Sequence, residues 1–188
     1  YPLNERVSPQ EFLAEANCQM KPWDAASYSK GLILLNPDKK LPVVEMMNEL
    51  MDLGVDLSTA RRYAYLKNES KVDSSMLARG IKGDVDPLLK KEDNLEKGRK
   101  LWKASLNKFS ISLLKHRYFV DFFIGKYECA ENREGLCDRF VEFIESMSKK
   151  DVEAIEKAKG KKGVISKEEL VVMKLNELYN VKYGEENN

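Results

Sequence analysis

The longest stretch with an uninterrupted helical repeat runs from Leu95 to Gly125, and it constrains the fold more than any other segment. At about 100° per residue, its apolar side chains recur on one side, as in a helix that buries one face. Residues 118–124 are apolar on nearly every side before Gly125 offers a stop. We therefore expect one central helix. Its predicted core stripe consists of Leu95, Trp102, Leu106, Phe109, Leu113 and Val120.

Basic residues gather in the same segment. Between Leu88 and Arg117 there are nine basic and three acidic residues, so this stretch carries +6, whereas the whole chain carries only +1. A basic helical face attracts phosphates, acidic protein surfaces or anionic lipid. Lysines also line the solvated side of ordinary core helices, so the pattern leaves a purely structural interpretation open.

Helix start and stop signals recur along the rest of the chain. Ser8 followed by proline predicts a first helix that ends before Pro22, and Pro42 opens another that ends at Gly54. Together these signals predict an all-α fold of about seven or eight helices, a bundle-like globule with orthogonally packed helices and no extended sheet. Further expected N-caps are Asp56 or Ser58, Asp73, and Ser166 in a capping box with Glu169.

The length of 188 residues suits a single helical domain spanning 1–188. Residues 83–87 combine one glycine, two aspartates and one proline, and this composition is typical of a hinge. A division into an N-terminal lobe, 1–82, and a C-terminal lobe, 88–188, therefore stays open.

Residues 43–66 have the order of a helix-turn-helix unit. A methionine-rich helix at 43–51 precedes Gly54, and the following helix carries Arg61 and Arg62 near its start. Arginines in that position contact guanine or phosphate in DNA-binding proteins. Similar corners are common in helical proteins that bind no DNA.

Two functions follow from these patterns. The first is a non-enzymatic nucleic-acid-binding protein, such as a nucleoprotein, replication factor or regulatory factor, that uses the basic face at 97–117. The alternative is a protein-interaction or self-association module that uses the apolar 118–124 surface or the methionine-rich 43–51 surface. The candidate nucleic-acid-binding residues are Arg61, Arg62, Lys97, Arg99, Lys100, Lys103, Lys108, Lys115 and Arg117.

Catalytic and metal-binding patterns are not found in the sequence. His116 is the sole histidine, and no glycine-rich phosphate loop or nucleophile motif is present. Cys18, Cys129 and Cys137 form no ligand pair, so we expect neither a metal nor a cofactor. Unpaired cysteines, no signal pattern and no apolar span favour an intracellular protein of the cytoplasm or nucleus that is not secreted and not in a membrane.

The stretch from Lys149 to Lys162 is highly charged, with acidic residues before basic ones. This order matches a helix dipole, since carboxylates are favourable at a helix start and lysines at its end. We favour this explanation over a phosphate-binding patch.

Overall fold

The computed structural model describes residues 8, 12, 23–68, 72–91 and 93–184. The helix expected between Ser8 and Pro22 lies almost wholly outside these residues. Within them the prediction of an all-α fold is confirmed: ten α-helices, more than the number expected, accompany one short 3-10 helix. The β-structure of the described residues amounts to an isolated bridge between Lys161 and Ile165. None of the described helices is both long and apolar enough to cross a bilayer.

The helices take their bounds from local capping signals. Aspartate side chains accept hydrogen bonds from the first turns of several helices, and Pro42 begins α3. The elements are α2 (Ala25–Leu35), α3 (Pro42–Asp52), α4 (Leu57–Tyr65), α5 (Ser74–Ile81), η1 (Pro87–Lys90), α6 (Leu95–Lys108), α7 (Ile111–Leu114), α8 (Arg117–Cys129), α9 (Leu136–Ser146), α10 (Lys149–Glu156) and α11 (Lys167–Tyr183).

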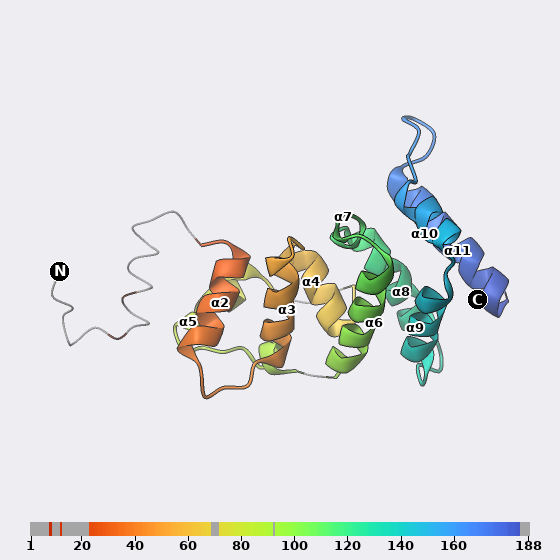
Figure 1. The fold of residues 1–188 in the computed structure, drawn as a ribbon. Coiled ribbons are helices and arrows are strands. Elements are labelled where there is room, and N and C mark those ends of the chain that lie inside the picture. The colour runs from red at the N-terminus through yellow and green to blue at the C-terminus, as the bar shows by residue number, and fades with distance from the viewer. Residues whose placement is uncertain (1–7, 9–11, 13–22, 69–71, 92, 185–188) are drawn as a thin grey trace.

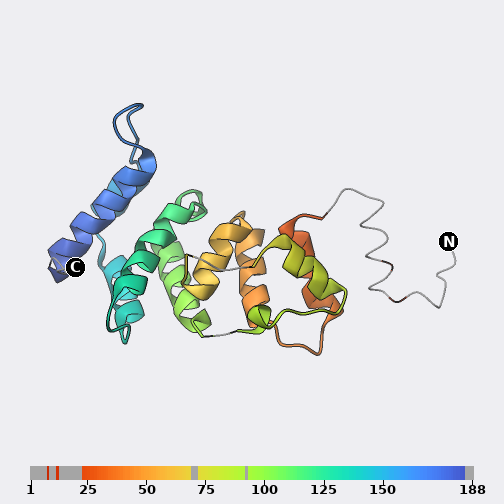
Figure 2. The same ribbon diagram turned by 180° about the vertical axis from the view of Figure 1, so that it is seen from behind.

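The helices form an elongated row (Figure 1). The pair α2 and α5 lies at one end, followed by α3, α4 and α6, then α8 and α9, with α10 and α11 at the other end (Figure 2). α4 packs against α3, α6 and α8, while α6 packs most extensively against α9. Helices from before and after the expected hinge at 83–87 therefore contact one another in the middle of the row.

The predicted central helix is broken into three pieces, so the expectation of one helix from 95 to 125 is wrong. α6 ends at Lys108, where Phe109 takes an extended conformation, and α8 begins only at Arg117. The break lets α8 turn back to pack against α4. The apolar side chains of the sequence keep a helical spacing across this break because the helices on both sides bury their apolar faces in one core.

The expected core is confirmed at most positions. Trp102, Phe109 and Leu113 are buried in the same cluster as Phe140 and Phe143 of α9. Leu106 is the exception, with 42% of its surface exposed, because the packed side of α6 follows a different set of residues. The buried residues of α6 are Leu95, Gly98, Leu101, Trp102, Ala104 and Ser105.

The backbones of α4 and α6 approach each other closely at Gly98. A Cβ atom on Gly98 would lie 1.8 Å from the carbonyl oxygen of Tyr63, so this position has room only for hydrogen. Beside it the rings of Tyr63 and Trp102 meet edge to face, with centroids 4.9 Å apart. The close packing of α4 against α6 in the middle of the row therefore requires glycine at position 98.

The helix expected through Lys162 is also shorter than predicted. α10 ends at Glu156, and its last turn contains no basic residue. The chain between Glu156 and Lys167 instead forms a separate connection to α11. The helix-dipole explanation therefore applies at most to Lys157, the C-cap residue.

Candidate nucleic-acid interface

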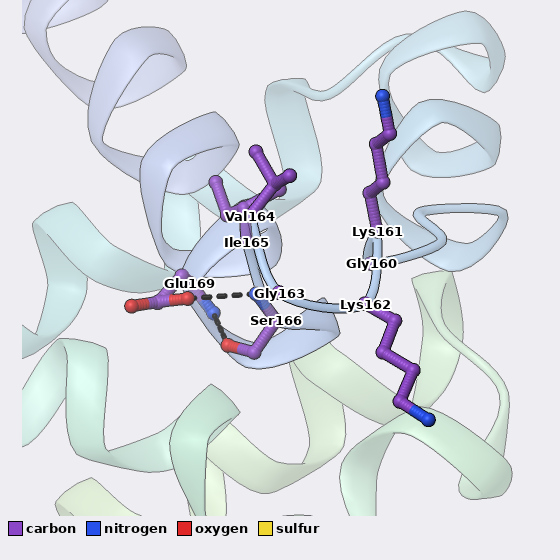
Figure 3. Close-up of a pocket in the computed structure, with 8 residues that line it drawn as sticks. All are labelled: Gly160, Lys161, Lys162, Gly163, Val164, Ile165, Ser166 and Glu169. Atoms are coloured by element: carbon purple, nitrogen blue, oxygen red, sulfur yellow. Dashed lines mark hydrogen bonds between the residues drawn. The ribbon is translucent and has the colours of Figure 1, made fainter.

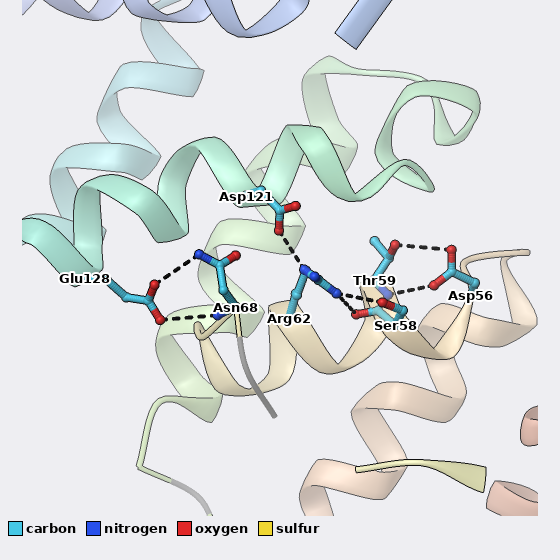
Figure 4. Close-up of polar contacts among 7 residues, drawn as sticks. All are labelled: Asp56, Ser58, Thr59, Arg62, Asn68, Asp121 and Glu128. Carbon is cyan, nitrogen blue, oxygen red and sulfur yellow. Dashed lines mark hydrogen bonds and ion pairs between the residues drawn. The ribbon is translucent and has the colours of Figure 1, made fainter. Parts of the chain in front are cut away.

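Arg62 joins α4 to α8. Its Nε lies 2.7 Å from Oδ1 of Asp121, and its Nη1 donates to the backbone oxygen of Ser58 at 3.0 Å (Figure 4). Partial burial raises the pKa of Asp121, an effect that the neighbouring Arg62 charge opposes. The side chain of Arg62 is almost fully buried, so this predicted DNA-contacting residue is an internal ion-pair partner.

Arg61 also bonds to another part of the protein. Its Nη1 donates to the backbone oxygen of Val72 at 2.8 Å. Since α4 also lies between α3, α6 and α8, the second helix of the helix-turn-helix pattern packs within the row. The two arginines are held by the protein's own groups and do not join the lysines of α6 in one contact network among the described residues.

Two of the cations on α6 have carboxylate partners. Arg99 lies 3.4 Å from Glu49 of α3 and also donates to the backbone oxygen of Pro42. Lys100 lies 2.9 Å from Asp138 of α9, and this hydrogen bond raises the pKa of Lys100. Both pairs partly neutralise the basic segment and connect α6 to different neighbours.

Lys97 and Lys108 bond to uncharged acceptors. Lys97 donates to the hydroxyl of Tyr127 at 3.0 Å, and that hydroxyl donates to Asn94 at 3.2 Å. Lys108 donates to the backbone oxygen of Met147 at 3.2 Å. The sequence places Lys97 and Lys108 roughly opposite the apolar stripe of the helix, but in the structure both are partly buried and bond to groups that pack against α6. Their positive charges nevertheless remain uncompensated, because neither acceptor is an anion.

Lys103, Lys115 and Arg117 are exposed, and their side chains form no hydrogen bond or ion pair with any residue that the structure describes. Arg117 acts on Asp121 through its charge alone. Five of the seven basic residues at 97–117 therefore have no carboxylate within ion-pair distance in the described chain. The five are Lys97, Lys103, Lys108, Lys115 and Arg117.

The surfaces expected for protein interaction are part of the core. In the 118–124 stretch all residues except Asp121 are buried, and Phe122 and Phe123 pack into an aromatic cluster with Phe143. In the 43–51 stretch Met46 and Met47 are buried as well. These apolar side chains are therefore occupied within the fold, whereas Met51 is only partly buried, and the alternative function stays a prediction.

The cysteines and acidic residues do not gather into a metal site in the described chain. That part of the protein holds no group of three or more histidine, cysteine, aspartate or glutamate side chains suited to a metal ion. Cys129 is exposed, whereas Cys137 is buried and donates to the backbone oxygen of Lys97. Burial raises the pKa of the Cys137 thiol to about 11, which keeps it protonated at neutral pH.

The comparisons with known proteins supply no family for this chain. No protein-family model matches it, and neither does any curated protein or any solved structure. The charges and contacts of the described residues are therefore what supports a function.

Proposed function

We propose that the protein is a non-enzymatic nucleic-acid-binding protein that contacts the phosphate backbone through cations of the α6–α8 segment. The supporting observation is that five of the seven basic residues at 97–117 lack a carboxylate partner in the described chain. Phosphate contacts by lysine and arginine supply most non-specific affinity for nucleic acid. A nucleic-acid ligand would place the protein in the cytoplasm or nucleus.

The contacts themselves are assigned to the exposed members of this set, Lys103, Lys115 and Arg117. Lys97 and Lys108 add positive potential but use their ammonium groups within the fold. The remaining predicted residues are not part of the proposal, because backbone oxygens or carboxylates of the protein occupy their donors. These are Arg61, Arg62, Arg99 and Lys100.

A triple variant, K103Q/K115Q/R117Q, tests the proposal in gel-shift titrations with single-stranded RNA, single-stranded DNA and duplex DNA at two salt concentrations. We expect weaker binding to all sequences. The slope of log affinity against log salt should fall by about 2–3, because each lost phosphate contact removes about 0.7–0.9. Folding stability should change by no more than about 0.5 kcal/mol, as for most exposed substitutions.

The matched control is K39Q/K40Q/K82Q, which removes the same charge from exposed lysines near the α2 end of the row. It should bind like the wild type. Equal weakening by both variants would show that net charge alone matters and would refute the assigned contacts. A wild-type protein that binds no nucleic acid at low salt would refute the function itself.

A further inference from the structure

The connection between α10 and α11 is an ordered hairpin. Figures 1 and 2 show it projecting beyond the ends of both helices. The backbone N–H of Lys161 donates to the oxygen of Ile165 at 2.8 Å, and Val164 and Ile165 donate back to Lys161 at 2.9 and 3.1 Å. Gly163 makes the turn with a φ of +76°, which favours glycine.

The base of the hairpin is fixed to the start of α11 (Figure 3). A Cβ atom on Gly160 would lie 2.6 Å from the backbone nitrogen of Lys167 and 2.7 Å from the oxygen of Ile165. Glu169 accepts from the backbone N–H of Ser166 at 2.7 Å, and its own N–H donates to the Ser166 hydroxyl at 3.1 Å. The loop borders an open hollow of about 480 Å³.

The hairpin concentrates positive charge. Residues 157–167 contain five lysines and no acidic residue, so they carry +5 in a chain of net charge +1, and all other residues together carry −4. Lys157 pairs with Glu153 at 2.8 Å. The other four lysines are exposed, and their side chains form no hydrogen bond or ion pair within the described chain. They are Lys159, Lys161, Lys162 and Lys167.

The neighbouring carboxylates of Glu168 and Glu169 form no ion pair with these lysines within the described chain. Glu169 lines the hollow, but its carboxylate caps α11, and hydrogen bonds from Ser166 lower its pKa. Glu168 acts on Asp121 and Tyr118 of α8, whose pKa values it helps to raise. Lys159, Lys161 and Lys162 lie outside both α10 and α11, so no helix of which they are part gains from their charge. Neither capping nor local ion pairing therefore accounts for them.

We propose that the hairpin, residues 157–167, is a phosphate-binding element that contacts the backbone of nucleic acid through Lys159, Lys161 and Lys162. The inference rests on the proposed function and adds a second contact surface at the far end of the row. Lys161 and Lys162 extend in opposite directions from the narrow loop (Figure 3). They can reach phosphates on two sides of a groove or strand, whereas a flat lipid surface would meet only one of them.

A triple variant, K159Q/K161Q/K162Q, tests this assignment against the same control, K39Q/K40Q/K82Q. In the gel-shift titrations the hairpin variant should lose affinity, and its salt slope should fall by about 2–3. The control should match the wild type. An unchanged affinity and salt slope in the hairpin variant, with a wild type that binds, would overturn the inference and leave the proposed function standing.

Backbone amide signals provide a direct readout. In nuclear magnetic resonance titrations of the wild type with a single-stranded oligonucleotide, the signals of Gly160 and Gly163 should shift. Those of Gly54 and Gly83, which lie in turns at the opposite half of the row, should not. Unmoved Gly160 and Gly163 signals in a saturated complex would also overturn the inference.

Two further outcomes separate this inference from its alternatives. A wild type that binds no nucleic acid but binds vesicles of phosphatidylcholine and phosphatidylserine in equal parts would overturn both proposals and identify an anionic-lipid site. Weakening by the hairpin variant without weakening by K103Q/K115Q/R117Q would support the hairpin and remove the contacts assigned to α6–α8.

Discussion

Replacing Gly98 by alanine should destabilise the protein by roughly 2 kcal/mol. The added Cβ would lie 1.8 Å from the Tyr63 carbonyl oxygen, whereas carbon and oxygen normally approach no closer than about 3.3 Å. The backbones of α4 and α6 would have to separate by about 1.5 Å, since neither atom can rotate away. Overpacking costs about 1–3 kcal/mol, and this site belongs at the upper end. The higher helix propensity of alanine compared with glycine offsets about 1 kcal/mol of this cost.

Chemical denaturation followed by far-UV circular dichroism measures this change, and Trp102 fluorescence reports it locally because that ring packs on Tyr63. A loss of 2 kcal/mol corresponds to a fall in Tm of about 4–8 °C for a chain of this size. Gly125→Ala is the matched control, because nothing lies within 4 Å of its Cβ position on α8. The control should stabilise the protein by about 0.5–1 kcal/mol. A Gly98→Ala variant as stable as the wild type would refute the close approach.

Three further changes test the core, the ion pair and a helix cap. Phe109→Ala should cost roughly 3–5 kcal/mol in chemical denaturation, because it empties a buried site packed against Phe119. Arg62→Met should lower the free energy of unfolding by an amount near the lower end of about 3–5 kcal/mol, since the Asp121 side chain stays 29% exposed. Adding Asp121→Asn to this variant should recover most of the lost stability, because no unpaired carboxylate then remains. Glu169 has a lowered pKa in the folded state, so its stabilising effect is complete above its ordinary pKa of 4.5 and is lost as the pH falls through the lower folded value. Glu169→Gln should therefore reduce the acid sensitivity of Tm.

The outcomes that contradict these expectations are specific. A loss below about 1 kcal/mol at Phe109 would mean that its ring does not fill the core. Additive losses in the Arg62 and Asp121 double variant would show that the two groups do not interact. An unchanged acid dependence of Tm after Glu169→Gln would remove the capping carboxylate as a contributor.

The helix starts could be predicted from the sequence because the interactions that fix them are local. Asp56 and Asp73 accept hydrogen bonds from backbone N–H groups three residues later, as expected from their positions. The capping box of Ser166 and Glu169 is likewise confirmed. Such contacts span one helical turn, so residue order alone defines them.

Contacts between distant residues could not be predicted in this way. Arg62 meets Asp121 only because α4 and α8 pack together, and Lys97 of α6 meets Tyr127 of α8 only because the fold brings those two helices near each other. No local pattern in one sequence encodes these pairings. The sequence therefore predicts a basic face but not which of its donors bind within the protein.

The sequence of the hairpin contains a pattern that argues against the helix-dipole explanation. Gly160 and Gly163 stand three residues apart among the lysines, and two glycines so close together disfavour a helix. Their presence indicates that the lysines follow the helix and do not belong to its last turn. The bridge between Lys161 and Ile165 then depends on a turn geometry that charge order cannot reveal.

A row of helices whose two ends do not contact each other in the described chain should not unfold as one cooperative unit. The pair α10 and α11 is held mainly through α11, where Tyr179 enters the aromatic cluster beside Phe122 and Lys182 pairs with Glu142 of α9. Opening this end requires the loss of few contacts, whereas opening α4 or α6 disrupts the middle of the row. Amide hydrogen exchange should therefore be fastest at the hairpin end, and a ligand bound there should slow exchange in α10 and α11 well before it affects α4.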